Sequence, residues 1–146
     1  MSTTSKEMKR FNCLLGETEA AYHEAFLKLG LSDSAMNILY VICDQGESCL
    51  LQEICRRSGL SKQTVNSAIR KLEGEGVLYL EQAGAKAKKV FLTERGKELA
   101  GKTALRIIQI ENAIVASWTK EDVETYLKLT ERYLTDFKKK AAELGN

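Results

Sequence analysis

The sequence predicts a mainly α-helical fold with one small β-hairpin, and three observations lead to that class. Apolar residues recur at helical spacing along most of the 146 residues, and the chain holds ten glycines and no proline, a composition that favours long helices with short joints. Residues 51–72 contain two short helical patterns separated by Ser58-Gly59. Two β-prone runs, residues 77–82 and 88–93, follow directly and indicate the hairpin.

Two amphipathic helices are predicted before residue 46. The first runs from about residue 5 to 29, ends at Gly30, and has an apolar face broad enough to require packing partners. Ser32 is the expected N-cap of the second helix, which ends at Gly46. The apolar face of the first helix contains Phe11, Leu14, Leu15, Tyr22, Phe26 and Leu29, and the core stripe of the second contains Ala35, Leu39, Ile42 and Cys43.

Residues 51–72 have the pattern of a helix-turn-helix. Gly59 ends the first helix, and Leu60 is positioned to fill the angle between the two helices. Ser61 is the expected N-cap of the second helix. That second helix must bury an apolar stripe formed by Val65, Ala68, Ile69 and Leu72.

The opposite face of this second helix carries hydrogen-bonding and cationic groups and no carboxylate. DNA base edges present donors and acceptors inside a negative groove, so such a face is suited to read a duplex. Gln63 and Asn66 are expected to pair with adenine, and Arg70 with guanine or a phosphate. An ordinary solvated helix face is the alternative. The candidate DNA-contacting residues of this segment are Ser61, Lys62, Gln63, Thr64, Asn66, Ser67, Arg70 and Lys71.

The two β-prone runs are joined by Ala83-Gly-Ala-Lys-Ala87, which predicts a hairpin directly after the helix-turn-helix. Lys86, Lys88 and Lys89 place positive charge at its tip and on its returning strand, where a phosphate backbone would pass, and they complete the candidate DNA-binding set. Residues 48–51 predict a very short strand that pairs with the base of this hairpin.

The order of these segments resembles the MarR (multiple antibiotic resistance regulator) family of winged helix-turn-helix regulators, over essentially the whole chain. The most specific pieces are Leu-Ser-Lys-Gln-Thr-Val at residues 60–65 and Leu-Thr-Glu-Arg-Gly at residues 92–96. One departure concerns the hairpin, or wing, which in the family usually carries Asp-x-Arg before the Leu-Thr. Ala83 and Ala85 lie nearest those positions, so Lys86 or Lys88 is expected to take the place of the arginine, with less selectivity.

Thr93 is the expected cap of one long helix, roughly residues 94–117, and Thr119 with Asp122 predicts a capping box for the last helix. The terminal helices carry more apolar surface than a small winged helix can cover, so a two-fold homodimer is expected; a helical cap on a monomer is the alternative. The predicted organisation is a single domain, 1–146, with a DNA-reading part at 32–93 and dimerisation helices at 5–29 and 94–144.

Composition narrows the classes of function. The net charge is only +2, but residues 56–106 hold 12 Lys and Arg against 5 Asp and Glu, whereas the rest of the chain holds 10 against 15. A cytoplasmic protein without membrane association is expected, because no apolar leader or span is evident. The sequence shows no nucleophile–base constellation, no phosphate-binding glycine loop, no CxxC and a single histidine, so no enzyme activity, cofactor or metal site is expected.

The resemblance implies an effector pocket between the first two helices and the start of the long one. Its candidate residues are Tyr22, Phe26, Met36, Tyr40 and Arg106. A small aromatic effector would bind there and release a repressor from a pseudo-palindromic operator in double-stranded DNA.

Two other functions remain open at this point. Cys13 lies near the position where the peroxide-sensing branch of the family keeps its reactive thiol, so an oxidant-sensing repressor is one alternative, although a small buried hydrophobe is the favoured interpretation of Cys13. Cys43 and Cys55 are expected in the core and Cys49 at an edge. The second alternative is a protein-interaction module that uses the winged helix only as a scaffold.

Overall fold

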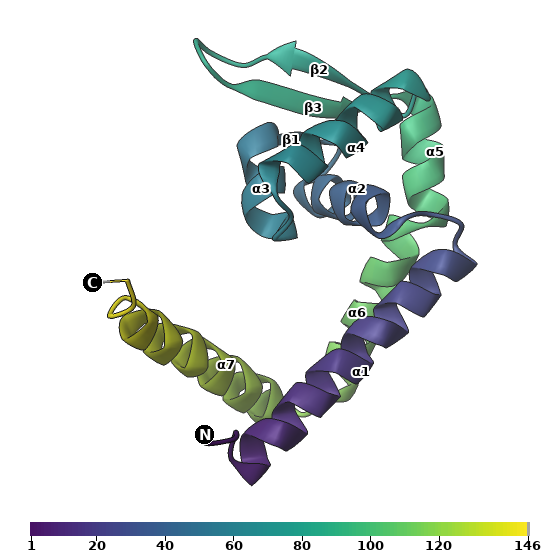
Figure 1. The fold of residues 1–146 in the computed structure, drawn as a ribbon. Coiled ribbons are helices and arrows are strands. Elements are labelled where there is room, and N and C mark those ends of the chain that lie inside the picture. The colour runs from purple at the N-terminus through teal and green to yellow at the C-terminus, as the bar shows by residue number, and fades with distance from the viewer. Residues whose placement is uncertain (146) are drawn as a thin grey trace. The chain divides into compact units, whose positions relative to one another are not determined.

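The computed structural model describes residues 1–145, and it has the predicted mainly helical class with a small antiparallel sheet (Figure 1). The elements, in chain order, are α1 (Lys6–Lys28), α2 (Asp33–Gln45), β1 (Ser48–Leu50), α3 (Leu51–Ser58), α4 (Lys62–Gly74), β2 (Leu78–Gln82), β3 (Lys88–Leu92), α5 (Glu94–Lys102), α6 (Ala104–Ser117) and α7 (Lys120–Ala141).

The chain divides into two compact units. The first spans Met1–Ile108 and contains α1 to α5, the sheet and the start of α6, and the second begins at Gln109 and contains the rest of α6 together with α7. The helix-turn-helix and the hairpin therefore lie entirely within the first unit.

The sheet has the strand order β1-β3-β2, with both pairs antiparallel. The predicted short strand is confirmed, because β1 pairs with the returning strand of the hairpin and places Cys49 opposite Val90. The hairpin loop is closed by the backbone N–H of Ala83, which donates to the carbonyl of Ala87 at 2.8 Å. Gly84 lies inside this loop at φ 88°, a left-handed conformation that a glycine adopts without strain.

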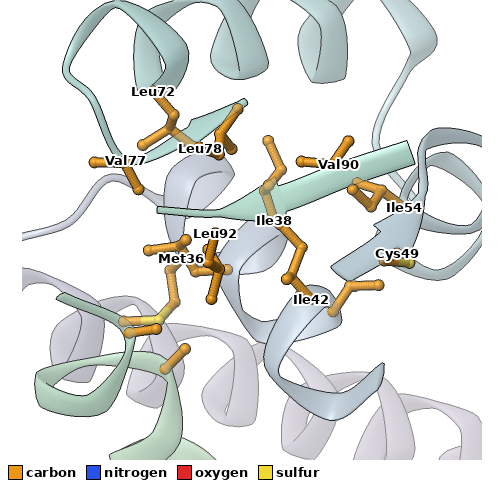
Figure 2. Packing of buried hydrophobic residues seen from close by; sticks show 14 of the residues in the cluster. Met36, Ile38, Ile42, Cys49, Ile54, Leu72, Val77, Leu78, Val90 and Leu92 are labelled. Carbon is orange, nitrogen blue, oxygen red and sulfur yellow. The ribbon is translucent and has the colours of Figure 1, made fainter. Parts of the chain in front are cut away.

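The core of the first unit is built around α2, which contacts α3, α4, α5 and the sheet. Met36, Ile38, Leu39 and Ile42 are completely buried, because the apolar stripe of this helix faces partners on several sides. Figure 2 shows side chains from α2, the helix-turn-helix and the sheet converging on this cluster.

The cysteines differ from the expectation. Cys49 is buried, at 4 % exposure, because the middle residue of β1 points to the inner face of the sheet, whereas Cys43 and Cys55 are partly exposed at the margin of the core. Burial raises the pKa of the Cys49 and Cys43 thiols above their ordinary value. The interpretation of Cys13 as a small buried hydrophobe is wrong for the single chain, because its side chain is exposed on α1. The residue that α1 buries is Phe26, near the other end of the helix.

The predicted single helix 94–117 is also wrong in one respect, because it is interrupted at Thr103. This residue has φ −128° and ψ −86°, it is buried, and its hydroxyl donates to the carbonyl of Leu99 at 2.7 Å. Gly101 disfavours helix in the preceding turn, and the threonine hydroxyl offers the backbone an alternative hydrogen bond. The result is two helices, α5 and α6, in place of one.

The Leu-Thr-Glu-Arg-Gly stretch attaches α5 to the turn before β2. The Thr93 hydroxyl caps α5 by accepting from the backbone N–H of Gly96 at 3.0 Å, and it donates to the carbonyl of Gly76 at 2.6 Å. A Cβ atom at Gly96 would lie 1.9 Å from the carbonyl oxygen of Val77. Only glycine allows this close backbone approach.

The terminal helices leave large apolar side chains in solvent. α7 buries none of its residues in the single chain, although Thr119 caps it as predicted by accepting from the N–H of Asp122 at 3.0 Å. The exposed set includes Phe11, Leu14 and Leu15 on α1, Ile110, Ile114 and Val115 on α6, and Tyr126, Leu127, Leu129, Tyr133, Leu134 and Phe137 on α7. Within residues 1–145, no single helix is long and apolar enough to cross a membrane; α1 and α2 meet that criterion only when taken together across a 90° bend.

Candidate nucleic-acid interface

The second helix of the helix-turn-helix, α4, is positioned by its cap and by its buried stripe. The Ser61 hydroxyl accepts from the backbone N–H of Thr64 at 3.1 Å, as predicted, and Gly59 ends α3 in the left-handed region at φ 70°. Val65, Ile69 and Leu72 are buried, and Ala68 is partly buried. The predicted stripe is confirmed, and it fixes which side chains of α4 face solvent.

The solvent-facing side of α4 presents the side chains expected to read DNA. Gln63, Ser67 and Arg70 are exposed, and Asn66 is partly buried beside them. The first turn of α4 holds no acidic residue, and the first carboxylate of the helix comes at Glu73. The exposed surface of about the first three turns therefore combines amide, hydroxyl and cationic groups without an opposing charge.

A groove of about 650 Å³ borders one flank of α4, between this helix and the start of α2. Its walls mix hydroxyl groups and a lysine with apolar side chains and one carboxylate, Glu75. The lining residues are Gly30, Leu31, Ser32, Ser34 and Ala35 before and in α2, Gln63, Thr64, Ser67, Ala68, Lys71 and Leu72 of α4, and Glu75, Val77 and Leu99.

A second groove, of about 400 Å³, lies among α3, α4 and the wing, and we call it the lysine groove. It brings together four candidates from separate segments: Lys62 and Asn66 of α4, and Lys86 and Lys88 of the wing. Its remaining lining residues are Leu51, Gln52, Cys55 and Ala87. Sequence reasoning missed Gln52 as a functional candidate, although its position three residues before Cys55 places both on one face of α3.

Lys89 does not join its neighbour in this groove. Side chains alternate along β3, so Lys88 shares the face of the buried Val90, whereas Lys89 lies on the opposite face of the sheet with Phe91. The Lys89 ammonium is 5.5 Å from the centroid of the Phe91 ring, which in turn stacks on Tyr79 at 5.2 Å. The hairpin thus separates two consecutive lysines onto different surfaces.

The cations of the first unit differ in their partners. Arg57 pairs with Asp44 at 2.5 Å, Arg56 pairs with Glu53 at 2.7 Å, and hydrogen bonds to Glu47 and Glu94 raise the pKa of Lys97. Within residues 1–145, by contrast, the cationic side chains of α4 and the wing form no salt bridge; they are Lys62, Arg70, Lys71, Lys86, Lys88 and Lys89. Unneutralised charge therefore collects on the α4 and wing surface, which favours an anionic partner.

None of the five effector candidates lines either groove. Phe26 and Met36 are buried, and Tyr22 makes an edge contact with Phe26 at a centroid distance of 6.0 Å. Tyr40 is partly buried, and Arg106 is exposed.

The remaining candidate, Cys13, lies on the exposed surface of α1, where its thiol donates to a carboxylate oxygen of Glu17 at 3.7 Å. In the part of the chain that the structure describes, no group of three His, Cys, Asp or Glu side chains is placed to hold a metal ion.

Comparison with known proteins finds similarity to one family of regulators. Residues 29–88, from just before α2 to the start of β3, match the model of the MarR family. No curated protein is similar enough in sequence to serve as a relative.

Several solved structures share the fold of this chain at low sequence identity. NMB1585, a MarR family regulator from Neisseria meningitidis, is 16% identical with a TM-score of 0.83, over 95% of this chain and 99% of that one. BpsR of Bordetella bronchiseptica, whose DNA binding is regulated by 6-hydroxynicotinic acid, is 18% identical with a TM-score of 0.63, over 85% and 98%. NadR, solved in complex with 4-hydroxyphenylacetate, is 16% identical with a TM-score of 0.69, over 91% and 97%.

The family match covers the helix-turn-helix and the first strand of the wing, and it agrees with the shared fold. The chain has the winged helix-turn-helix fold of solved MarR regulators, and the model of that family matches residues 29–88.

Proposed function

We propose that this protein is a transcriptional regulator of the MarR family and a sequence-specific repressor that binds double-stranded DNA through α4 and the wing. The observation that carries the proposal is the exposed face of α4, where Gln63, Ser67 and Arg70 lie among cations that form no salt bridge with any residue from 1 to 145. Amide and guanidinium groups on such a face can form paired hydrogen bonds with base edges in the major groove. Residues 32–93 form the DNA-reading part in this proposal.

The protein acts as a homodimer built from residues 5–29 and 94–144. The support is the row of large apolar side chains on α7, where Tyr126, Leu127 and Phe137 are each 58–59% exposed in the single chain. Burying one such side chain contributes about 1.5–3 kcal/mol, so several of them together outweigh the cost of association. A two-fold dimer presents two recognition helices, which suits a pseudo-palindromic operator.

A small aromatic acid releases the repressor from its operator. This part of the proposal is supported by BpsR and NadR, whose folds are similar and whose structures concern 6-hydroxynicotinic acid and 4-hydroxyphenylacetate. The candidate residues are Tyr22, Phe26, Met36, Tyr40 and Arg106, and the buried Phe26 and Met36 would have to yield space to a ligand.

Fluorescence anisotropy with duplexes from the region upstream of the regulator's own coding sequence tests the proposal. Binding is expected at low salt and should weaken as salt is added. In a plot of the logarithm of the association constant against the logarithm of the salt concentration, each phosphate contact contributes a slope of about −0.9. 4-Hydroxyphenylacetate and 6-hydroxynicotinic acid are the first effectors to add, with release of the duplex as the expected result. Absence of binding at low salt would favour the protein-interaction module instead.

A further inference from the structure

The joint between α5 and α6 has two alternative sets of hydrogen bonds. In the structure, Thr103 donates its backbone N–H to the carbonyl of Ala100 at 3.2 Å and its hydroxyl to the carbonyl of Leu99 at 2.7 Å. In a continuous α-helix the N–H of Thr103 would bond to Leu99, and the N–H of Ala104 would bond to Ala100. Both carbonyls therefore have a donor whether the helix is broken or continuous.

The break leaves the start of α6 without the hydrogen bonds of a helix interior. Within residues 1–145, no backbone hydrogen bond connects the N–H groups of Ala104 and Leu105 to a carbonyl of α5. Ala104 is completely buried, so water cannot readily replace the missing partner. A continuous helix would restore these bonds, and the Thr103 hydroxyl, which donates to Leu99, stabilises the break against that alternative.

The joint connects the effector candidates to α4. Arg106, one of these candidates, donates its backbone N–H to the carbonyl of Thr103 at 3.0 Å, and Ile107 belongs to the same buried cluster as Met36, another candidate. Before the joint, Leu99 lines the groove that borders α4. All of these residues lie in the first compact unit. A rearrangement at Thr103 would therefore change the packing both at the effector candidates and along α4.

We infer that the α5–α6 joint is a two-state element that switches between the broken form and a continuous helix, and that the Thr103 hydroxyl stabilises the broken form. This inference rests on the proposed function, because it assigns to the joint the step that connects effector binding to DNA release. The change exchanges one set of hydrogen bonds for another within a single turn, so the two forms are close in free energy. A ligand that packs better against one form shifts the joint toward that form.

Thr103→Val and Thr103→Ser form a matched pair of variants. Valine keeps the shape and approximate helix propensity of threonine but has no hydroxyl, whereas serine keeps the hydroxyl. In the broken form the valine variant leaves the Leu99 carbonyl without this donor, whereas in the continuous helix the backbone N–H of residue 103 supplies one. Thr103→Val is therefore expected to favour the continuous helix, and Thr103→Ser to retain the break.

Amide hydrogen exchange reports the state of the joint. It is followed residue by residue by NMR on the full-length protein at one fixed concentration, with the amides of α2 as the reference for global stability. In Thr103→Val the amides of Ala104 and Leu105 are expected to exchange about fivefold to tenfold more slowly than in wild type, because they gain hydrogen-bond partners. A variant that is only destabilised would exchange faster at these positions. In Thr103→Ser the two amides are expected to keep their wild-type rates.

The regulatory consequence is measured by anisotropy with the upstream duplex. Thr103→Val is expected to change the affinity by about fivefold or more, although Thr103 is buried and cannot touch DNA, and Thr103→Ser is expected to bind as wild type does.

The outcomes separate the inference from the proposed function. If wild type binds no duplex, the proposed function fails, whereas the exchange rates still test the joint. If the Ala104 and Leu105 amides of Thr103→Val exchange at the wild-type rate or faster, the continuous form does not exist and the inference is overturned while DNA binding stands. If exchange slows but the affinity of Thr103→Val is unchanged, the joint has no part in DNA release and its regulatory role is overturned.

Discussion

Gly96→Ala tests the junction between the wing and α5. The added Cβ would lie 1.9 Å from the carbonyl oxygen of Val77, whereas real Cβ atoms essentially never approach a neighbour within 3.0 Å. The obstacle is backbone, so it cannot rotate away, and the start of α5 has to move from the turn before β2 by about 1 Å. The Thr93 hydroxyl, which bonds Gly76 and Gly96 across this contact, moves with it.

The magnitude follows from three contributions. Overpacking of this kind costs about 1–3 kcal/mol, and the weakened Thr93 hydrogen bond adds about 1 kcal/mol. Alanine regains about 1 kcal/mol through its higher helix propensity. The net loss is therefore about 1–3 kcal/mol, equivalent to a decrease in Tm of about 3–10 °C for a chain of this length.

Gly101→Ala is the matched control within the same helix. Nothing lies within 4 Å of a Cβ at Gly101, and α5 is helical there, so this variant is expected to be as stable as wild type or to gain up to about 1 kcal/mol. Both variants are unfolded thermally at one fixed protein concentration, with circular dichroism as the measurement, because dimerisation makes Tm depend on concentration. A Gly96→Ala variant at least as stable as Gly101→Ala would refute the reasoning.

The remaining predictions concern DNA reading, oxidation and assembly. Gln63→Ala should cost about 1–3 kcal/mol of operator affinity and relax the preference at particular base pairs, whereas Lys88→Ala should weaken the binding of all duplexes about equally. The measurement compares affinities for an operator and for its point variants. A changed base preference in the lysine variant alone would reverse the assignment. Peroxide treatment should leave the DNA affinity of wild type and Cys13→Ser equal, since an aromatic effector is the proposed signal; release of wild type with retention of Cys13→Ser would establish the thiol switch instead. Leu127→Asp and Leu134→Asp should each convert the dimer into an unstable monomer, as measured by sedimentation. Both side chains are more than half exposed in the single chain, so a protein that is a monomer would tolerate these changes, and that outcome would contradict the dimer.

The sequence predicts the elements whose residues are close together along the chain. The stripe from Val65 to Leu72, the cap at Ser61 and the hairpin around Gly84 are local patterns, and the structure confirms each of them. The outward face of α4 follows from the same stripe, because burial of one side of a helix determines which side remains in solvent.

Features that depend on contacts between distant segments could not be predicted in this way. The lysine groove joins residues of α3, α4 and the wing, and its depth depends on how three elements pack. The separation of Lys88 from Lys89 requires the register of β3, and the burial of Cys49 requires the pairing of β1 with that strand. The break at Thr103 stayed hidden because the apolar pattern continues from α5 into α6.

The central position of β3 has a consequence for folding. β3 follows β2 in the hairpin, yet it also pairs with β1, and Ser48 lies opposite Phe91 across a chain segment that contains the whole helix-turn-helix. That pairing can form only when the ends of this segment meet, which is a non-local step that slows folding relative to the closure of the hairpin alone. Once formed, it encloses α3 and α4 in a loop held at both ends by backbone hydrogen bonds. Amides of β1, β3 and the intervening helices should therefore exchange with solvent as one cooperative unit, so that the wing cannot open without loosening the recognition helix.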